Sequence, residues 1–145
     1  MASAVLAPRS DRRPSTYPAA LRRRAADPRI VGRLAQMLGP PENGAVVDVG
    51  AGTGNYAAAL AGRGYQVVAV EPSATMRDQA ENVPGVRWVD AMAEQLSLPN
   101  GCAGGVVCVL ALHHFLPVVC WDEIYDLGSL QIGLLDRRKY AQIRP

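Results

Sequence analysis

The sequence predicts one α/β domain in which a parallel sheet is flanked by helices, and three observations carry that prediction. Short β-branched runs alternate with helical segments from Gly44 to about residue 111, a pattern typical of right-handed strand–helix–strand units. The first of these runs ends in a glycine-rich turn that opens a helix. The length of 145 residues allows at most one domain, with a core of its own.

We expect the first ordered element to be a helix that begins next to Asp27. The Asp27 side chain can accept hydrogen bonds from free amides, and the proline that follows suits the first helical turn. Ile30, Leu34 and Leu38 recur every four residues and form one apolar face. A glycine and two prolines at 39–41 end the helix.

The alternating part of the chain supplies the sheet and its connecting helices. We expect strands at 45–49, 66–70, 86–89 and 105–111, and helices at 54–61, from the cap Ser73 to about Asn82, and at 91–96. Open α/β sheets bind ligands beyond the carboxyl ends of their strands. The residues that fall at or near those ends are Asp48, the turn 50–54, Glu71, Asp90 and His113.

Residues 45–56, AVVDVGAGTGNY, carry the strongest functional signal. Glycines at 50, 52 and 54 allow a ligand to lie against bare backbone, with the amides of the next helix pointing at it, as in nucleotide-type cofactor sites. A dinucleotide fingerprint places its third glycine three positions after the second. Here the interval is two, and Asn55 stands where that pattern requires glycine. A dinucleotide oxidoreductase is therefore disfavoured.

The order D-x-G-x-G-x-G resembles motif I of the class I S-adenosylmethionine (SAM) dependent methyltransferases. Two further segments resemble that family, VVAVEPSATM at 67–76 and DAMAEQLSLPNG at 90–101. A third, GGVVCVLALHHF at 104–115, resembles the fourth strand of its type 11 branch. Glu71 lies 21 positions after Gly50, where the family has its ribose-binding acid. The resemblance covers about residues 17–115 and implies a Rossmann-like fold.

The resemblance also implies SAM as the cofactor and a set of residues that bind it. Glu71 would accept hydrogen bonds from both ribose hydroxyls, and Asp90 would accept one from the adenine amino group. Asp48 would organise the turn and the sulfonium side of the ligand. The structural alternatives are an Asp48 bonded to turn amides only and an Asp90 in a plain surface turn. The full set is Asp48, Gly50, Ala51, Gly52, Thr53, Gly54, Glu71, Asp90 and Ala91.

Methyl transfer from SAM needs little side-chain chemistry, because the cofactor already carries the activated group. His113 or His114 could act as a base for an O–H or N–H acceptor; alternatively, both histidines pack or line the acceptor pocket. Tyr17 resembles a residue of the segment that leads into motif I. No metal site is expected, since the histidines and the three cysteines (Cys102, Cys108, Cys120) lack zinc spacing.

The last 30 residues depart from the family pattern, because no R-x-L-x-P-G-G turn follows the fourth strand. We interpret this as a truncation after that strand, with the C-terminal strands missing, or as a divergent end. The predicted division is a disordered basic arm at 1–26, a SAM-binding methyltransferase core at 27–115 and a divergent or truncated tail at 116–145. An exposed edge on the fourth strand would allow a homodimer to form there.

Charge and composition limit the kinds of molecule that this chain is expected to bind. Residues 1–33 hold eight arginines against two aspartates, so this arm is either solvated or binds an anionic surface. No N-P-P-Y-type motif follows the fourth strand, so a nucleic-acid acceptor is disfavoured and a small-molecule acceptor is expected.

No apolar run reaches the roughly 18 residues that span a bilayer. The odd number of cysteines suits reduced thiols in the cytoplasm. The remaining alternative is an inactive remnant or a SAM-binding interaction module.

Overall fold

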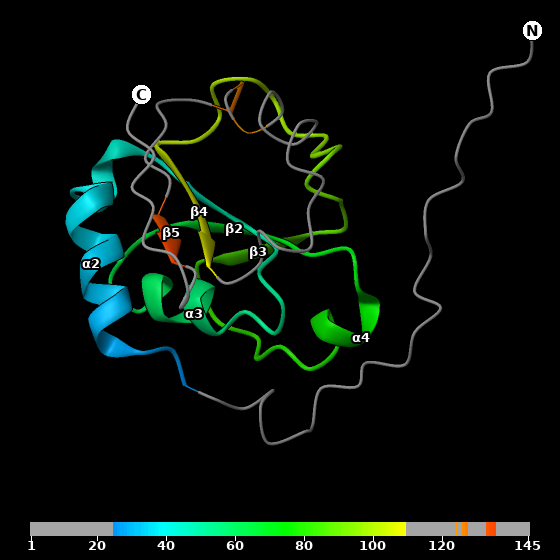
Figure 1. The fold of residues 1–145 in the computed structure, drawn as a ribbon, viewed down its shortest axis with the longest axis horizontal. Coiled ribbons are helices and arrows are strands. Elements are labelled where there is room, and N and C mark those ends of the chain that lie inside the picture. The colour runs from blue at the N-terminus through cyan, green and yellow to red at the C-terminus, as the bar shows by residue number, and fades with distance from the viewer. Residues whose placement is uncertain (1–24, 110–123, 125, 128–132, 136–145) are drawn as a thin grey trace, which may run out of the picture.

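The computed structural model describes residues 25–109, 124, 126–127 and 133–135, which form a parallel sheet with helices packed beside it (Figure 1). The elements in chain order are α2 (Pro28–Leu38), the 3₁₀ helix η1 (Pro41–Asn43), β1 (Val46–Val49), α3 (Asn55–Ala61), β2 (Val67–Val70), α4 (Ala74–Arg77), β3 (Val86–Val89), β4 (Gly105–Val109) and β5 (Gly133–Leu135). The predicted α/β class with a parallel sheet is confirmed.

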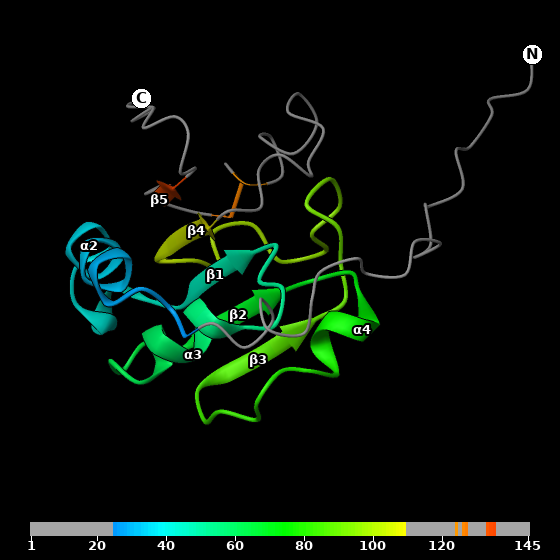
Figure 2. The ribbon, with the colours of Figure 1, turned by 60° about the horizontal axis from the view of Figure 1, so that its bottom comes forward.

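The sheet has the strand order β3-β2-β1-β4-β5, and every pair of neighbours is parallel (Figure 2). β1 lies in the middle, with Asp48 opposite Ala69 on one side and Val107 on the other. The chain runs outward from β1 through β2 to β3 and then returns to the other side of β1 for β4. Such a reversal of strand order creates a crevice beyond the carboxyl ends of the strands. The fold therefore places the ends of β1 and β4 at the expected ligand position.

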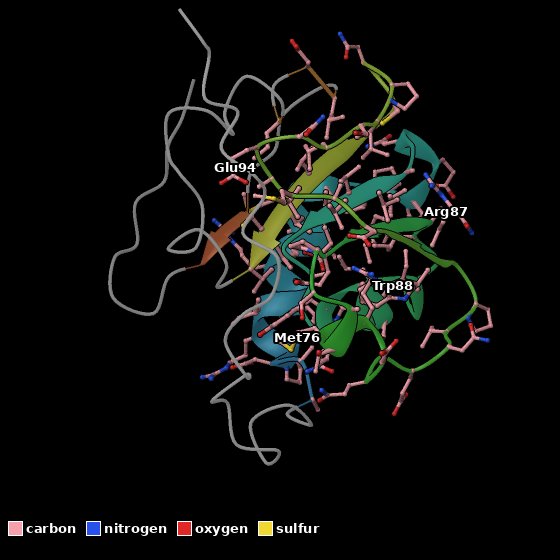
Figure 3. All side chains as sticks on the ribbon, turned by 90° about the vertical axis from the view of Figure 1, so that its right-hand side faces the viewer. Met76, Arg87, Trp88 and Glu94 are labelled. Atoms are coloured by element: carbon pink, nitrogen blue, oxygen red, sulfur yellow. The ribbon has the colours of Figure 1, made fainter. Side chains whose placement is uncertain are left out.

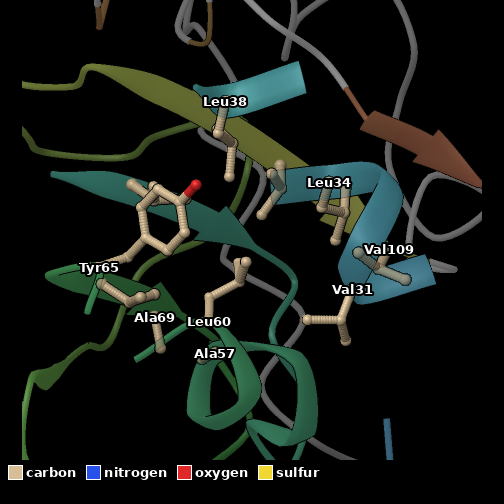
Figure 4. Packing of buried hydrophobic residues seen from close by; sticks show 11 residues of the cluster. Val31, Leu34, Leu38, Ala57, Leu60, Tyr65, Ala69 and Val109 are labelled. Atoms are coloured by element: carbon tan, nitrogen blue, oxygen red, sulfur yellow. The ribbon is translucent and has the colours of Figure 1, made fainter. Parts of the chain in front are cut away.

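Helix α2 forms where the sequence predicted it. The Asp27 carboxylate accepts a hydrogen bond from the Arg29 amide at 2.9 Å and pairs with the Arg29 guanidinium at 2.8 Å. Val31, Leu34 and Leu38 are buried against the sheet, whereas Ile30 is only partly buried. The apolar face is therefore turned slightly from the predicted one, and it packs with α3 on the same side of the sheet (Figure 4).

The last turn of α2 is held by side chains from other elements. The Tyr65 hydroxyl lies within hydrogen-bond reach of the carbonyl oxygens of Ala35 and Gly39. Arg63 donates to the Val31 carbonyl oxygen at 3.2 Å. The Ala35 carbonyl oxygen also accepts from the Gly39 amide at 3.1 Å, so the Tyr65 hydroxyl is the needed donor for the Gly39 carbonyl oxygen, which lies beyond the helix C-terminus. Tyr65 and Arg63 together join α2 to the segment between α3 and β2.

Tyr65→Phe is expected to lower the free energy of unfolding by about 1–3 kcal/mol, because it leaves the partly buried Gly39 carbonyl oxygen without its hydroxyl donor. Urea unfolding at neutral pH would measure the change. Tyr56→Phe is the matched control, since within the described residues the Tyr56 hydroxyl makes only a 3.5 Å contact with the Asp27 amide. Equal losses in the two variants would contradict the role given to Tyr65.

The other face of the sheet carries a second apolar cluster. Alternate residues of β1, β2 and β4 pack there against Ala93, Leu96, Ala103, Ile124 and Leu127. The amides of Gly101 and Ala103 donate to the carbonyl oxygens of Asp126 and Leu127, each at 2.8 Å. The described residues of 124–127 are therefore tied to the segment that leads into β4.

Two predicted helices are wrong in extent or kind. The helix expected from Ser73 to about Asn82 ends at Arg77. Beyond it the amides of Gln79 and Ala80 bond three residues back instead of four, and no buried side chain is available there to hold a longer helix. The helix expected at 91–96 is a turn with an isolated antiparallel bridge between Met92 and Gln95, and only Ala93 and Leu96 of this segment are buried.

We expected the strands after the fourth one to be missing, but the sheet continues with one more strand. β5 pairs in parallel with β4, so that Gly133 lies beside Val107 and Leu135 beside Val109. The edge of the fourth strand through which we expected a homodimer is therefore occupied over these residues.

Candidate cofactor-binding site

The glycine turn at 50–54 is anchored to the neighbouring strand. The amides of Gly50 and Ala51 both donate to the Val70 carbonyl oxygen, at 2.9 and 3.0 Å. The φ angles of Gly50, Gly52 and Gly54 are 74°, 59° and 80°, which lie in the left-handed region that favours glycine. The predicted turn is therefore present, with its backbone held open by the residue type.

A tryptophan from the edge strand packs against the last glycine of this turn. A Cβ atom on Gly54 would lie 2.6 Å from a ring carbon of Trp88, so the indole leaves no room for a side chain. Gly52 faces the Met76 methyl group, 3.6 Å from the position that a Cβ atom would take. Trp88 and Met76 come from β3 and α4 (Figure 3). Trp88 therefore requires glycine at position 54, whereas the Met76 methyl group would make only an ordinary van der Waals contact with a side chain at position 52.

Glu71 follows β2 directly and joins two backbone segments. One carboxylate oxygen accepts a hydrogen bond from the Gly52 amide at 2.9 Å, and the other accepts one from the Ser73 amide at 3.0 Å. Each carboxylate oxygen can accept a second hydrogen bond. The side chain therefore fixes the glycine turn and keeps acceptor capacity for hydroxyl groups of a ligand.

Asp48 is a buried acid in the central strand. Its exposed fraction is 2%, and no residue in the described part of the chain donates a hydrogen bond to its carboxyl group or pairs with it. Burial, together with the nearby Glu71 carboxylate, raises the pKa of Asp48 to about 7. The alternative in which turn amides satisfy this acid is not supported, because those amides bond elsewhere or make no contact with it.

Asp90 follows β3 and is paired with a residue that the sequence did not indicate. Its side chain is 67% exposed, and one oxygen lies 2.9 Å from the Arg77 guanidinium. The same guanidinium donates to the Glu71 carbonyl oxygen. The only signal for Arg77 is its place in the last turn of a short helix, where basic side chains often meet carbonyl groups. Ala91, beside Asp90, is half-buried.

The structure thus brings the predicted cofactor residues to the carboxyl ends of β1, β2 and β3, with Ala51 and Thr53 half-buried in the glycine turn. The candidates Tyr17, His113 and His114 lie outside the described residues. The described part of the chain contains no group of three metal-ligating side chains. None of its helices is long and apolar enough to span a membrane.

Comparisons with known proteins agree with this arrangement. Residues 47–128, more than half of the chain, match the family model described as Methyltransferase domain. A provisionally named methyltransferase of Dictyostelium discoideum is 34% identical over 90 residues, which are 59% of this chain and 34% of that protein.

Solved structures show the same similarity. A provisionally named methyltransferase from an antibiotic biosynthesis pathway of Anabaena variabilis matches with a TM-score of 0.71 and 38% identity over 83% of this chain and 50% of the other. A SAM-dependent methyltransferase of Thermotoga maritima matches with a TM-score of 0.61 and 26% identity over 77% of this chain and 52% of the other.

The chain thus spans about a third of the curated relative and about half of each of these two solved structures. The predictions of a Rossmann-like fold and of SAM as the cofactor of the family are confirmed. The chain belongs to the methyltransferase domain family.

Proposed function

We propose that this chain binds SAM and forms the cofactor half of an enzyme that transfers a methyl group to a small-molecule acceptor. One observation carries the proposal. The Glu71 carboxylate, at the end of β2, holds the Gly52 amide of the glycine turn at 2.9 Å, so the acid and the turn form one preorganised unit. That unit joins the two sites which the family uses for ribose and for the methionine moiety.

The remaining contacts support the same cofactor. Glu71 would accept hydrogen bonds from the two ribose hydroxyls, and Asp90 would accept one from the adenine amino group. Gly50, Gly52 and Gly54 let the ligand approach the backbone of the turn. Asp48, which has no partner among the described residues, lies buried next to this turn, where the positively charged end of SAM would supply a partner for its carboxyl group.

When bound, SAM supplies a methyl group on a positively charged sulfur. This group would be donated to a lone pair of the acceptor, and S-adenosylhomocysteine (SAH), which keeps the electron pair of the broken bond, would leave. An O–H or N–H acceptor loses its proton, for which His113 or His114 is the proposed base. Most of the rate would come from holding the two reactants in line.

The small-molecule acceptor is the finer part of this proposal. The Anabaena protein is named for an antibiotic biosynthesis pathway, and the name of the Thermotoga protein suggests histamine N-methyltransferase; both names point to small acceptors. The sequence has no N-P-P-Y-type motif for a nucleic-acid base. The cytoplasmic location and the division at residues 26 and 115 stay predictions.

Calorimetric titration of SAH into the 145-residue chain tests the proposal, with folding checked by circular dichroism. We expect one binding site and an affinity in the micromolar range, with NADH as a control ligand that does not bind. A folded chain that binds NADH instead would contradict the proposal in favour of an oxidoreductase. A folded chain that binds neither ligand would favour the interaction module.

A further inference from the structure

We propose that Arg77 positions Asp90 for the adenine amino group, so that this arginine determines how well the site distinguishes adenine from other bases. The inference rests on the proposed function above and extends it to a residue that would act through Asp90. It is carried by two contacts of one guanidinium group at the ends of neighbouring strands.

The Arg77 side chain connects the residues that follow β2 and β3. One of its nitrogens donates to the carbonyl oxygen of Glu71, and the other lies 2.9 Å from an Asp90 carboxylate oxygen. The Arg77 side chain is 20% exposed, whereas that of Asp90 is 67% exposed. The arginine is therefore the more buried and more firmly held member of the pair.

The place of Arg77 follows from the start of its helix. Ser73 caps α4, with its hydroxyl oxygen accepting a hydrogen bond from the Met76 amide at 3.3 Å, and the Arg77 amide donates to the Ser73 carbonyl oxygen at 3.1 Å. Four residues complete about one helical turn. Arg77 consequently comes back over the beginning of the helix, where Glu71 and the end of β2 lie.

An exposed carboxylate has no fixed direction of its own, and an isolated surface ion pair contributes little energy. Here the planar guanidinium is attached to a backbone carbonyl through one nitrogen, so the other nitrogen presents a donor in a defined place. The Glu71 amide in turn donates to the Val89 carbonyl oxygen at 3.1 Å, which fixes the two strand ends relative to each other. One oxygen of Asp90 is thereby occupied, and the second is left to accept from a ligand.

This geometry selects for a ligand with a hydrogen-bond donor at the base edge. Adenine offers an exocyclic amino group there, whereas hypoxanthine has a carbonyl oxygen at the same position, which a carboxylate repels. A site built around a hydrogen bond rejects an analogue that lacks the partner group. The suitable pair of probes is therefore SAH and its deaminated analogue S-inosylhomocysteine.

The experiment measures the affinities of both probes by calorimetry for the full chain and its variants. We expect the unmodified chain to prefer SAH by about tenfold or more, and Arg77→Met to reduce that preference to about threefold or less. Arg77→Lys should fall between them, since lysine keeps the charge but lacks the fork of two donors. Arg87→Met is the matched control: this exposed arginine of β3 makes no hydrogen bond or ion pair with the described part of the chain, and the preference should be unchanged.

Further variants test whether Arg77 acts through Asp90. Asp90→Asn should reduce the preference by itself, and Arg77→Lys added to it should cause no further change. An unaltered preference in a folded Arg77→Met variant would overturn the inference, as would equal losses of affinity for both probes, which indicate a purely structural role. If Arg77→Met does not fold, Arg77→Lys takes its place, and an unaltered preference for SAH in that variant would overturn the inference. An unmodified chain that binds neither probe would refute the proposed function, and the inference with it.

Discussion

Glu71→Ala is expected to weaken SAH binding by about a hundredfold or more, because two charge-assisted hydrogen bonds to the ribose would be lost at about 1.5–3 kcal/mol each. The same substitution removes the acceptors of the Gly52 and Ser73 amides. Part of the loss therefore comes from a glycine turn that is no longer held in place. The strands themselves keep their backbone pairing, so the fold should persist.

Calorimetry and circular dichroism on the same samples would check this result. Glu71→Gln separates the two contributions: its amide oxygen can still hold one backbone amide, but its nitrogen cannot accept from a hydroxyl. Glu81→Ala, at an exposed acid ten positions further on, is the matched control and should bind as the unmodified chain does. A folded Glu71→Ala variant with unchanged affinity would refute the ribose assignment.

The second large effect is a loss of stability with rising pH that originates at Asp48. The pKa of this acid is about 7 in the folded chain against an ordinary value of 3.8, so between these two pH values the folded state keeps a proton that the unfolded state has released. Its contribution to stability is complete below pH 3.8 and is lost as the pH rises to about 7. Within that window, the free energy of unfolding falls by up to roughly 1.4 kcal/mol for each pH unit.

Asp48→Asn removes the ionisable group and should remove this slope. We expect the variant to be more stable than the unmodified chain at pH 8 and to differ from it much less at pH 4, as measured by denaturant unfolding across that range. Asp78→Asn, at an exposed aspartate beside α4, is the matched control and should leave the slope in place. Parallel stability curves for the unmodified chain and Asp48→Asn would contradict the prediction.

Local patterns were sufficient to predict much of this structure. Asp27 caps α2 as expected, and β3 has the predicted bounds, because caps and β-branched runs depend on residues close in sequence. Glu71 lies against the glycine turn for the same reason, since one strand–turn–helix unit separates the two, and its role in ribose binding stays a prediction. Family resemblance then supplied roles that spacing alone could not.

What the sequence did not predict depends on contacts between distant segments. The pair of Arg77 and Asp90 requires β2 and β3 to lie side by side, which places residues 13 positions apart in contact. β5 forms next to β4 although 24 positions separate Val109 from Gly133, and no periodicity in the intervening residues indicates it. The helix expected at 91–96 failed because burial of Ala93 and Leu96 decides the path of that segment.

The central place of β1 has a consequence for synthesis of the chain. β2 follows it within 21 residues, but its other neighbour, β4, ends 60 residues after β1 does. At about 5–20 residues per second, a ribosome needs roughly 3–12 s to supply that neighbour. During this interval one side of β1 is an unpaired apolar edge, the kind of surface on which nascent chains associate. Asp48 sits in that edge and is ionised in water, and a charge there opposes pairing with a second chain. The acid whose burial costs stability in the folded chain would thus disfavour association of β1 with a second chain before β4 has been made.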